Sequence, residues 1–201
     1  MLIKRTLLSL LCLLCMTSIS YAQQKLSTSG VTMGQSKSEV LAVIKNKVEK
    51  YDERYDGNET TIRVKEFTVA GARFDSAIFT FIDNKLSRVG YWQDLAFGVD
   101  HPDFYSATLD APYASARIKA DNNRDKYTEL LNSLITKYGN PSTVTGSEAT
   151  KKCITWHVHN GTITLRYLRK EGYHHLYSTS RTIMSELSLE YEDSSAISTD
   201  L

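Results

Sequence analysis

Four histidines near the C-terminal end of the chain are the residues best suited to chemistry. His157 and His159 stand two apart in a segment of alternating apolar and polar residues, and His174 and His175 follow them. On a strand, side chains at i and i+2 project from one face, about 7 Å apart. Two such imidazoles could begin a zinc site, but no third ligand has suitable spacing. We favour the alternative, in which both histidines are polar residues on the outer face of an amphipathic strand.

Cys153 is the other candidate for catalysis. His157 could activate its thiol, and the neighbouring lysines could stabilise a thiolate. Within one strand, however, four residues separate two side chains by about 13 Å, which is too far for a dyad. The chain has no Gly-x-Ser-x-Gly, no phosphate-binding loop and no His-Glu-x-x-His. The sequence therefore predicts a protein that is not an enzyme and takes no cofactor. The alternative is an enzyme or metal-binding protein that uses histidines such as His101 near a loop at 94–123.

Asn160 and Gly161 separate two runs of alternating residues and predict a β-hairpin. A two-residue type I′ turn needs positive φ at both central positions, which Asn and Gly tolerate best. With these two residues as the loop, apolar pairs alternate with polar pairs along the whole hairpin. The predicted pairs are His159–Thr162, Val158–Ile163, His157–Thr164, Trp156–Leu165, Thr155–Arg166 and Ile154–Tyr167.

The two faces of this hairpin have different predicted roles. The apolar face should lie under helices, and its members are Ile154, Trp156, Val158, Ile163, Leu165 and Tyr167. The opposite face should stay open and bind a protein partner through donors, aromatic edges and one fixed positive charge. Its predicted binding residues are Thr155, His157, His159, Thr164 and Arg166. The alternative is an ordinary solvated sheet face.

Two helices are predicted to supply the cover. Ser36 and Glu39 form a capping box, which begins a helix at 37–50. A second helix begins near Arg124 and ends at Gly139. Their apolar stripes are Leu41, Ile44, Val48 and Tyr51 in the first helix, and Tyr127, Leu130, Leu131, Leu134 and Tyr138 in the second. The segments 52–59 and 94–123 are predicted as loops.

Further strands follow from alternation with a period of two. One lies at 60–69, and two more at 73–82 and 86–92 flank Asp83-Asn84-Lys85 and pair Phe79 with Val89 and Ala77 with Tyr91. The consecutive Tyr91 and Trp92 must point to opposite faces. A last strand carries Ile183, Leu187, Leu189 and Tyr191 on one face.

This order of elements predicts an α+β domain at 23–193 with a flexible tail at 194–201. We expect an antiparallel sheet with two helices on one face. Each helix is followed by three predicted strands, so the chain reads as a tandem α-β-β-β repeat, with pseudo-repeats at about 30–93 and 122–192.

Two short motifs support this architecture by resemblance. The segment GVTMGQSKSEV resembles the opening of β-lactamase-inhibitor-like and outer-membrane small-lipoprotein-like domains, and KYGNP resembles the Gly-x-Pro that closes their helices. The chain lacks the lipid-anchor cysteine of the lipoproteins and the disulfides of the inhibitors. The resemblance implies a non-enzymatic module whose open sheet contacts another protein.

The first 22 residues predict a cleavable signal peptide. Lys4 and Arg5 precede a short apolar run, and Ser20-Tyr21-Ala22 gives small residues before a cleavage site. Export to the periplasm or outside the cell would follow. The remaining chain has 22 basic and 23 acidic residues, which gives no electrostatic case for nucleic acid. It has one cysteine, Cys153, so no intrachain disulfide can form, and it has no apolar run long enough for membrane insertion.

Overall fold

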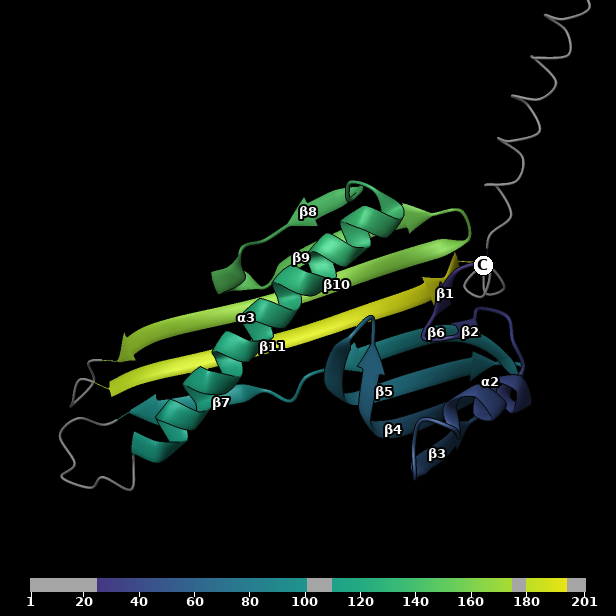
Figure 1. Ribbon diagram of the computed structural model, residues 1–201, viewed down its shortest axis with the longest axis horizontal. Coiled ribbons are helices and arrows are strands. Elements are labelled where there is room, and N and C mark those ends of the chain that lie inside the picture. The colour runs from purple at the N-terminus through teal and green to yellow at the C-terminus, as the bar shows by residue number, and fades with distance from the viewer. Residues whose placement is uncertain (1–24, 101–109, 175–179, 195–201) are drawn as a thin grey trace, which may run out of the picture.

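The computed structural model describes residues 25–100, 110–174 and 180–194 (Figure 1). The predicted signal peptide and most of the predicted tail lie outside these ranges. The described residues form an antiparallel sheet of nine strands in the order β3-β4-β5-β6-β11-β10-β9-β8, and β7 also pairs with β11. With two helices beside this sheet, the predicted α+β class with an antiparallel sheet is confirmed.

The first half of the sheet is a meander of four strands. They are β3 (Tyr51–Asp56), β4 (Glu59–Val69), β5 (Ala72–Ile82) and β6 (Lys85–Trp92). The predicted loop at 52–59 is wrong, because β3 pairs with β4 from Tyr51 opposite Val64 to Asp56 opposite Glu59. Its side chains are mostly charged and show no alternation of apolar and polar residues, so the sequence did not indicate a strand. Such charges are typical of a sheet edge, where they discourage pairing with other chains.

The β5–β6 hairpin has the predicted pairing but a different turn. Its loop is the two-residue Asp83-Asn84, and both residues have positive φ, 48° and 62°. A β-bulge between Thr80 and Phe81 then restores the predicted pairs of Phe79 with Val89 and Ala77 with Tyr91.

The second half of the sheet contains β8 (Thr143–Thr145), β9 (Lys152–Val158), β10 (Gly161–His174) and β11 (Ser180–Asp193). The predicted register of the β9–β10 hairpin is wrong by two positions. Gly161 pairs with Val158 and Ile163 with Trp156, so the turn residues are His159 and Asn160. Because the shift is an even number, the side chains that remain on the two strands keep their predicted faces, and only His159 leaves its strand. Ile154, Trp156, Ile163, Leu165 and Tyr167 are all buried.

Close contact with β11 explains the role of Gly161. It pairs with Asp193, and a Cβ atom there would lie 2.1 Å from the carbonyl oxygen of Glu192. The glycine is therefore needed for the close approach of two strands, rather than for a left-handed turn.

The longest helix is α3 (Asp110–Tyr138), and β7 (Ala96–Asp100) precedes it. The predicted loop at 94–123 is therefore wrong, although residues 101–109 lie outside the described ranges. The first half of α3 packs through small residues, Ala116 and Ala120, against Ile183. A stripe of alanines gives little hydrophobic periodicity, so the sequence did not indicate this half. Gly139, with φ of +79°, follows the helix as predicted.

The first helix is shorter than predicted. α2 (Lys37–Ile44) ends before Val48, and Tyr51 already belongs to β3. Val40 and Ile44 are its buried residues. Two short strands, β1 (Ser27–Thr28) and β2 (Val31–Thr32), pair with each other just before α2.

The predicted capping box at the start of α2 is confirmed. The Glu39 backbone N–H donates to Ser36 Oγ (3.4 Å), and the Ser36 backbone N–H donates to Glu39 Oε2 (2.8 Å). Replacing Ser36 by alanine should lower the free energy of unfolding by about 1 kcal/mol, because the N-cap bond is lost. Urea denaturation of Ser36→Ala, with Ser133→Ala at an exposed position of α3 as control, measures this. Equal stabilities of the two variants would contradict the capping role.

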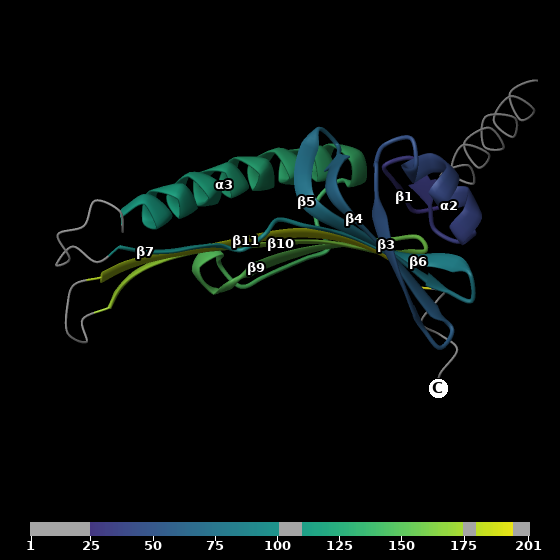
Figure 2. The same ribbon diagram turned by 90° about the horizontal axis from the view of Figure 1, so that it is seen from below.

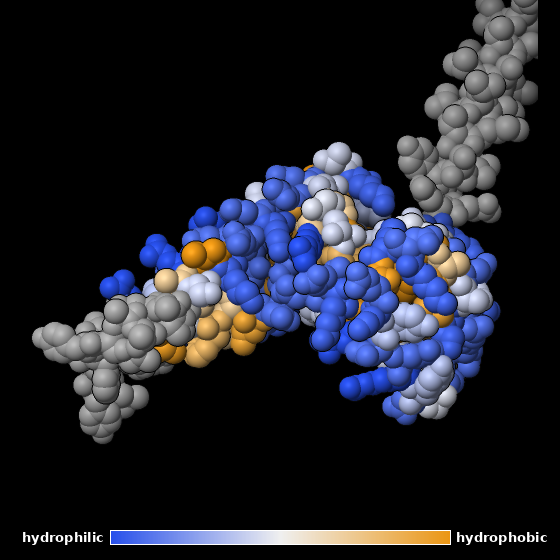
Figure 3. Space-filling model, turned by 60° about the horizontal axis from the view of Figure 1, so that its bottom comes forward, coloured by the Kyte–Doolittle hydropathy of each residue, from blue (hydrophilic) through white to orange (hydrophobic). Residues whose placement is uncertain are grey.

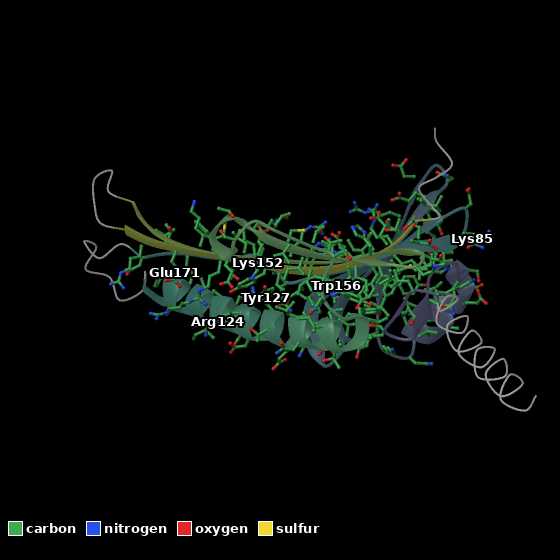
Figure 4. The ribbon with its side chains drawn as sticks, turned by 90° about the horizontal axis from the view of Figure 1, so that it is seen from above. Lys85, Arg124, Tyr127, Lys152, Trp156 and Glu171 are labelled. Atoms are coloured by element: carbon green, nitrogen blue, oxygen red, sulfur yellow. The ribbon has the colours of Figure 1, made fainter. Side chains whose placement is uncertain are left out.

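One hydrophobic core joins both halves of the sheet. It includes Val40 and Ile44 of α2 and Tyr127, Leu130 and Leu134 of α3, together with the inward residues of β4, β5, β6, β9, β10 and β11. Figure 2 shows α3 lying along one side of the sheet, and Figure 4 places Tyr127 and Trp156 between α3 and the strands. The Tyr127 and Tyr167 rings stack with centroids 4.5 Å apart. The other side of the sheet is the surface on which the predicted binding residues fall.

Candidate functional site

The sheet face opposite α3, called the outer face below, carries four of the five predicted binding residues. Thr155 lies directly opposite Thr164 on the neighbouring strand. His157 pairs with Thr162, and Arg166 pairs with Cys153. His157 is exposed and the others are half-buried. The structure therefore brings Thr155, His157, Thr164 and Arg166 onto one surface.

His159 does not belong to that surface. It lies in the β9–β10 turn, where it lines a small crevice with Lys25, Lys137 and Tyr138. The predicted register placed it on the strand, and the shift of two positions moved it into the turn.

Ion pairs cross the outer face and neutralise its charges. Arg166 Nη1 lies 2.5 Å from Glu190 Oε2, Arg88 Nη2 lies 2.7 Å from Glu192 Oε1, and Lys151 Nζ lies 2.6 Å from Glu186 Oε2. Partial burial opposes the charge of Arg166, but the hydrogen bond from Arg166 to Glu190 holds the pKa of this guanidinium above its usual value. The fixed positive charge expected on this face, that of Arg166, is therefore paired with the carboxylate of Glu190.

Trp92 is the largest side chain on the outer face. Tyr91 is fully buried, whereas Trp92 is half-buried and pairs with Ser188, so the two consecutive aromatics point to opposite faces as predicted. A Cβ atom on Gly90 would lie 1.9 Å from the Trp92 ring. The indole is therefore packed flat along the sheet, in the space that the missing side chain of Gly90 provides.

A groove of about 400 Å³ runs beside this indole. It opens where the chain leaves β6 and before β7 begins, since Gln93 and Leu95 form part of its wall. The Arg166–Glu190 and Lys151–Glu186 pairs line the rest, together with Leu187 and Ser188 of β11. Leu95 is 51% exposed. The groove thus combines apolar surface from Trp92 and Leu95 with two ion pairs that are already formed.

Sequence reasoning placed the site on the hairpin and missed the β6 side of the groove. The partners of Arg166 and Lys151 come from β11, and Trp92 comes from β6, far earlier in the chain than either pair. One local signal was present. A glycine two residues before a tryptophan on the same strand face leaves space into which the ring can lie.

Neither of the two alternatives to a binding surface, the zinc site or the Cys153–His157 pair, is formed by the described residues. Cys153 and His157 lie on one continuous strand, β9, which keeps them apart as predicted. No group of three or more His, Cys, Asp or Glu side chains there is arranged to hold a metal ion. His101 and His175 lie outside the described residues, and only the backbone of His174 is described.

No protein-family model, curated protein or solved structure matches this chain. None of the helices in the described ranges combines the length and the hydropathy that a bilayer-spanning helix needs. Figure 3 shows a surface that is mostly polar, with hydrophobic residues reaching it in a few places.

Proposed function

We propose that this chain is an exported, non-enzymatic module that binds or inhibits a protein partner through the outer face of its sheet. The observation that carries the proposal is the groove beside Trp92, bordered by Arg166 and Glu190. Tryptophan and arginine are the residues most often found at the energetic centres of protein interfaces.

The ion pairs of the outer face suit such a role. A partner that covers Arg166 or Lys151 buries a charge that already has an opposite charge within 2.6 Å. Burial of a paired, hydrogen-bonded charge costs much less than burial of a single one. The groove can therefore be covered without leaving an isolated charge, and Trp92 and Leu95 supply the apolar area. We place Thr155, His157 and Thr164 at the rim of the same interface.

The finer architecture and the compartment belong to the same proposal. We infer a tandem arrangement in which α2 and α3 each lead a helix-plus-sheet unit and lie on one face of the sheet. The meeting of β6 and β11 at the centre of the strand order supports it, because each is the last long strand of its half. Export through the predicted signal peptide and the likeness to inhibitor-like domains complete the proposal.

A pull-down with the immobilised chain from Gln23 onward tests the binding function. We expect the wild-type chain to capture a specific protein from an envelope extract or culture medium. The double variant Trp92→Ala/Arg166→Ala should retain less than about a tenth of it, because losing an aromatic anchor and a charged one costs more than a factor of ten.

Ile118→Ala is the matched control. Ile118 is 63% exposed on α3, away from the outer face. This variant should capture as much partner as the wild-type chain, and circular dichroism should show that all three proteins are folded at the temperature of the pull-down. Equal capture by the double variant, or loss of capture by the control, would contradict a site on the outer face.

A further inference from the structure

A second cavity lies on the helix side of the sheet, where four elements converge. It has a volume of about 230 Å³. Its walls are β1, the turn between β4 and β5, the last turns of α3, and the end of β11. Pockets for drug-sized molecules usually measure about 300–1,000 Å³. The cavity therefore suits a smaller molecule.

The floor of this cavity is apolar. Leu130 and Leu134 of α3 face Leu189 and Tyr191 of β11, and Val69 closes one side. All five belong to the buried core. A hydrocarbon chain or a ring placed against them would exchange water for apolar contact.

The mouth of the cavity is polar and positively charged. Its lining includes Ser27, Ser29 and Ser133, and Lys137 is its one charged residue. The crevice around His159 shares Ser27 and Lys137 with it and adds Lys25. Neither cavity has an aspartate or glutamate in its lining. Within the described residues, no carboxylate pairs with the Lys137 ammonium, which lies 4.9 Å from the Tyr138 ring centroid.

Two turns with left-handed residues form the walls at the mouth. Ser29 has φ of 53° and Ala70 has φ of 49°, and each precedes a glycine. Left-handed backbone is unfavourable for alanine, and Asn or Asp is the usual residue at this position of a tight hairpin turn. The small side chain of Ala70 therefore fills less of the cavity than Asn or Asp would, and its left-handed backbone lowers the stability of the fold. Strain of this kind is concentrated at ligand-binding positions in proteins.

Hydrogen bonds fix the β1 wall against the core. The hydroxyl of the buried Tyr91 lies 3.0 Å from Thr28 Oγ1 and donates to Ser29 Oγ, also at 3.0 Å. Lys47 Nζ donates to the Ser29 carbonyl oxygen at 2.6 Å. The β1 wall is thus fixed in place by contacts from β6 and from the segment that follows α2.

From these observations we propose that the cavity binds a small amphipathic carboxylate. Its apolar body lies against Leu130, Leu134 and Leu189, and its carboxylate pairs with the Lys137 ammonium. The charge of the mouth selects an anion and the floor selects an apolar body. This site is on the side of the sheet opposite the proposed protein interface. A result that overturns one proposal therefore leaves the other unaffected.

Calorimetric titration of the purified protein with octanoate tests the proposal, and 1-octanol is the neutral comparison. Lys137→Gln should weaken octanoate binding about five-fold, the loss expected for one partly exposed ion pair. The same variant should bind 1-octanol as the wild-type protein does. Ser133→Phe, at an exposed position in the lining, should abolish binding of both ligands by filling the mouth. The control is Lys119→Gln, an exposed lysine of α3 outside the lining, which should change neither affinity.

NMR provides the second readout. In the wild-type protein, octanoate should shift the methyl signals of Leu130, Leu134 and Leu189. This measurement does not depend on the stability of any variant. Absence of these shifts at saturating octanoate would overturn the site. If Lys137→Gln and the wild-type protein bind octanoate with equal affinity, the proposal that the ligand is an anion paired with Lys137 is overturned. Binding that survives Ser133→Phe would place the ligand elsewhere and also overturn the proposal.

Discussion

Replacing Gly161 by alanine is expected to lower the free energy of unfolding by about 3 kcal/mol or more. The new Cβ atom would lie 2.1 Å from the Glu192 carbonyl oxygen and 3.1 Å from Leu26 Cδ2. A backbone oxygen cannot move aside as a flexible side chain can. The β10–β11 pairing must therefore open locally, at the end of a long antiparallel ladder that runs from Gly161 to His174.

Gly172→Ala is a matched control, because Gly172 lies on the same strand. A Cβ atom there meets only Thr182 Oγ1, at 3.6 Å, which is ordinary van der Waals contact. We expect this variant to stay within about 1 kcal/mol of the wild-type protein in urea denaturation. Similar losses in the two variants would show that the close approach of Gly161 to β11 is wrong.

Trp156→Ala should cost about 3–5 kcal/mol of unfolding free energy. Trp156 is 1% exposed and is the largest of the fully buried side chains. Its indole N–H also donates to the Gly139 carbonyl oxygen at 2.9 Å, which ties the C-terminal end of α3 to β9. Truncation leaves a cavity beneath α3 and one carbonyl without this partner.

Trp92→Ala provides the comparison on the other face of the sheet. Trp92 is only half-buried, so we expect its removal to cost clearly less than that of Trp156. Trp156→Phe should lose about 1 kcal/mol, since it retains most of the apolar volume and loses the hydrogen bond. The assignment of faces is wrong if thermal and urea unfolding show the larger loss for Trp92→Ala.

Local chemistry made parts of this fold predictable. Ser36 and Glu39 marked the start of α2, because a capping box needs only four consecutive residues. Alternation assigned both faces of β9, β10 and β11 correctly, since the faces do not change when pairing moves by two positions. The exact register depended on a contact between Gly161 and Glu192, which are far apart in the chain. Turn chemistry alone could not reveal that contact.

The missed elements share a physical cause. β3 is a charged edge strand, and the first half of α3 packs through alanines, so neither shows the hydrophobic period of its structure. β3 is held by its pairing with β4, and the first half of α3 by its packing against Ile183 of β11. Only part of the candidate site could be predicted, because the rest depends on contacts between strands that are far apart in the chain. Arg166 could be assigned to the outer face from alternation, but its pairing with Glu190 and the groove beside Trp92 arise from the meeting of β6, β10 and β11.

If a protein partner covers the outer face, it should protect Cys153 from chemical modification. Cys153 is half-buried, pairs with Arg166 on that face, and is the one cysteine from Gln23 onward. The rate at which iodoacetamide alkylates Cys153, followed by intact-protein mass spectrometry, can be compared for the free chain and for the complex with the captured partner. Coverage of the face predicts that the partner slows this reaction by about ten-fold or more, since closed interfaces exclude solvent. An unchanged rate in a complex that is saturated with partner would contradict binding through this surface.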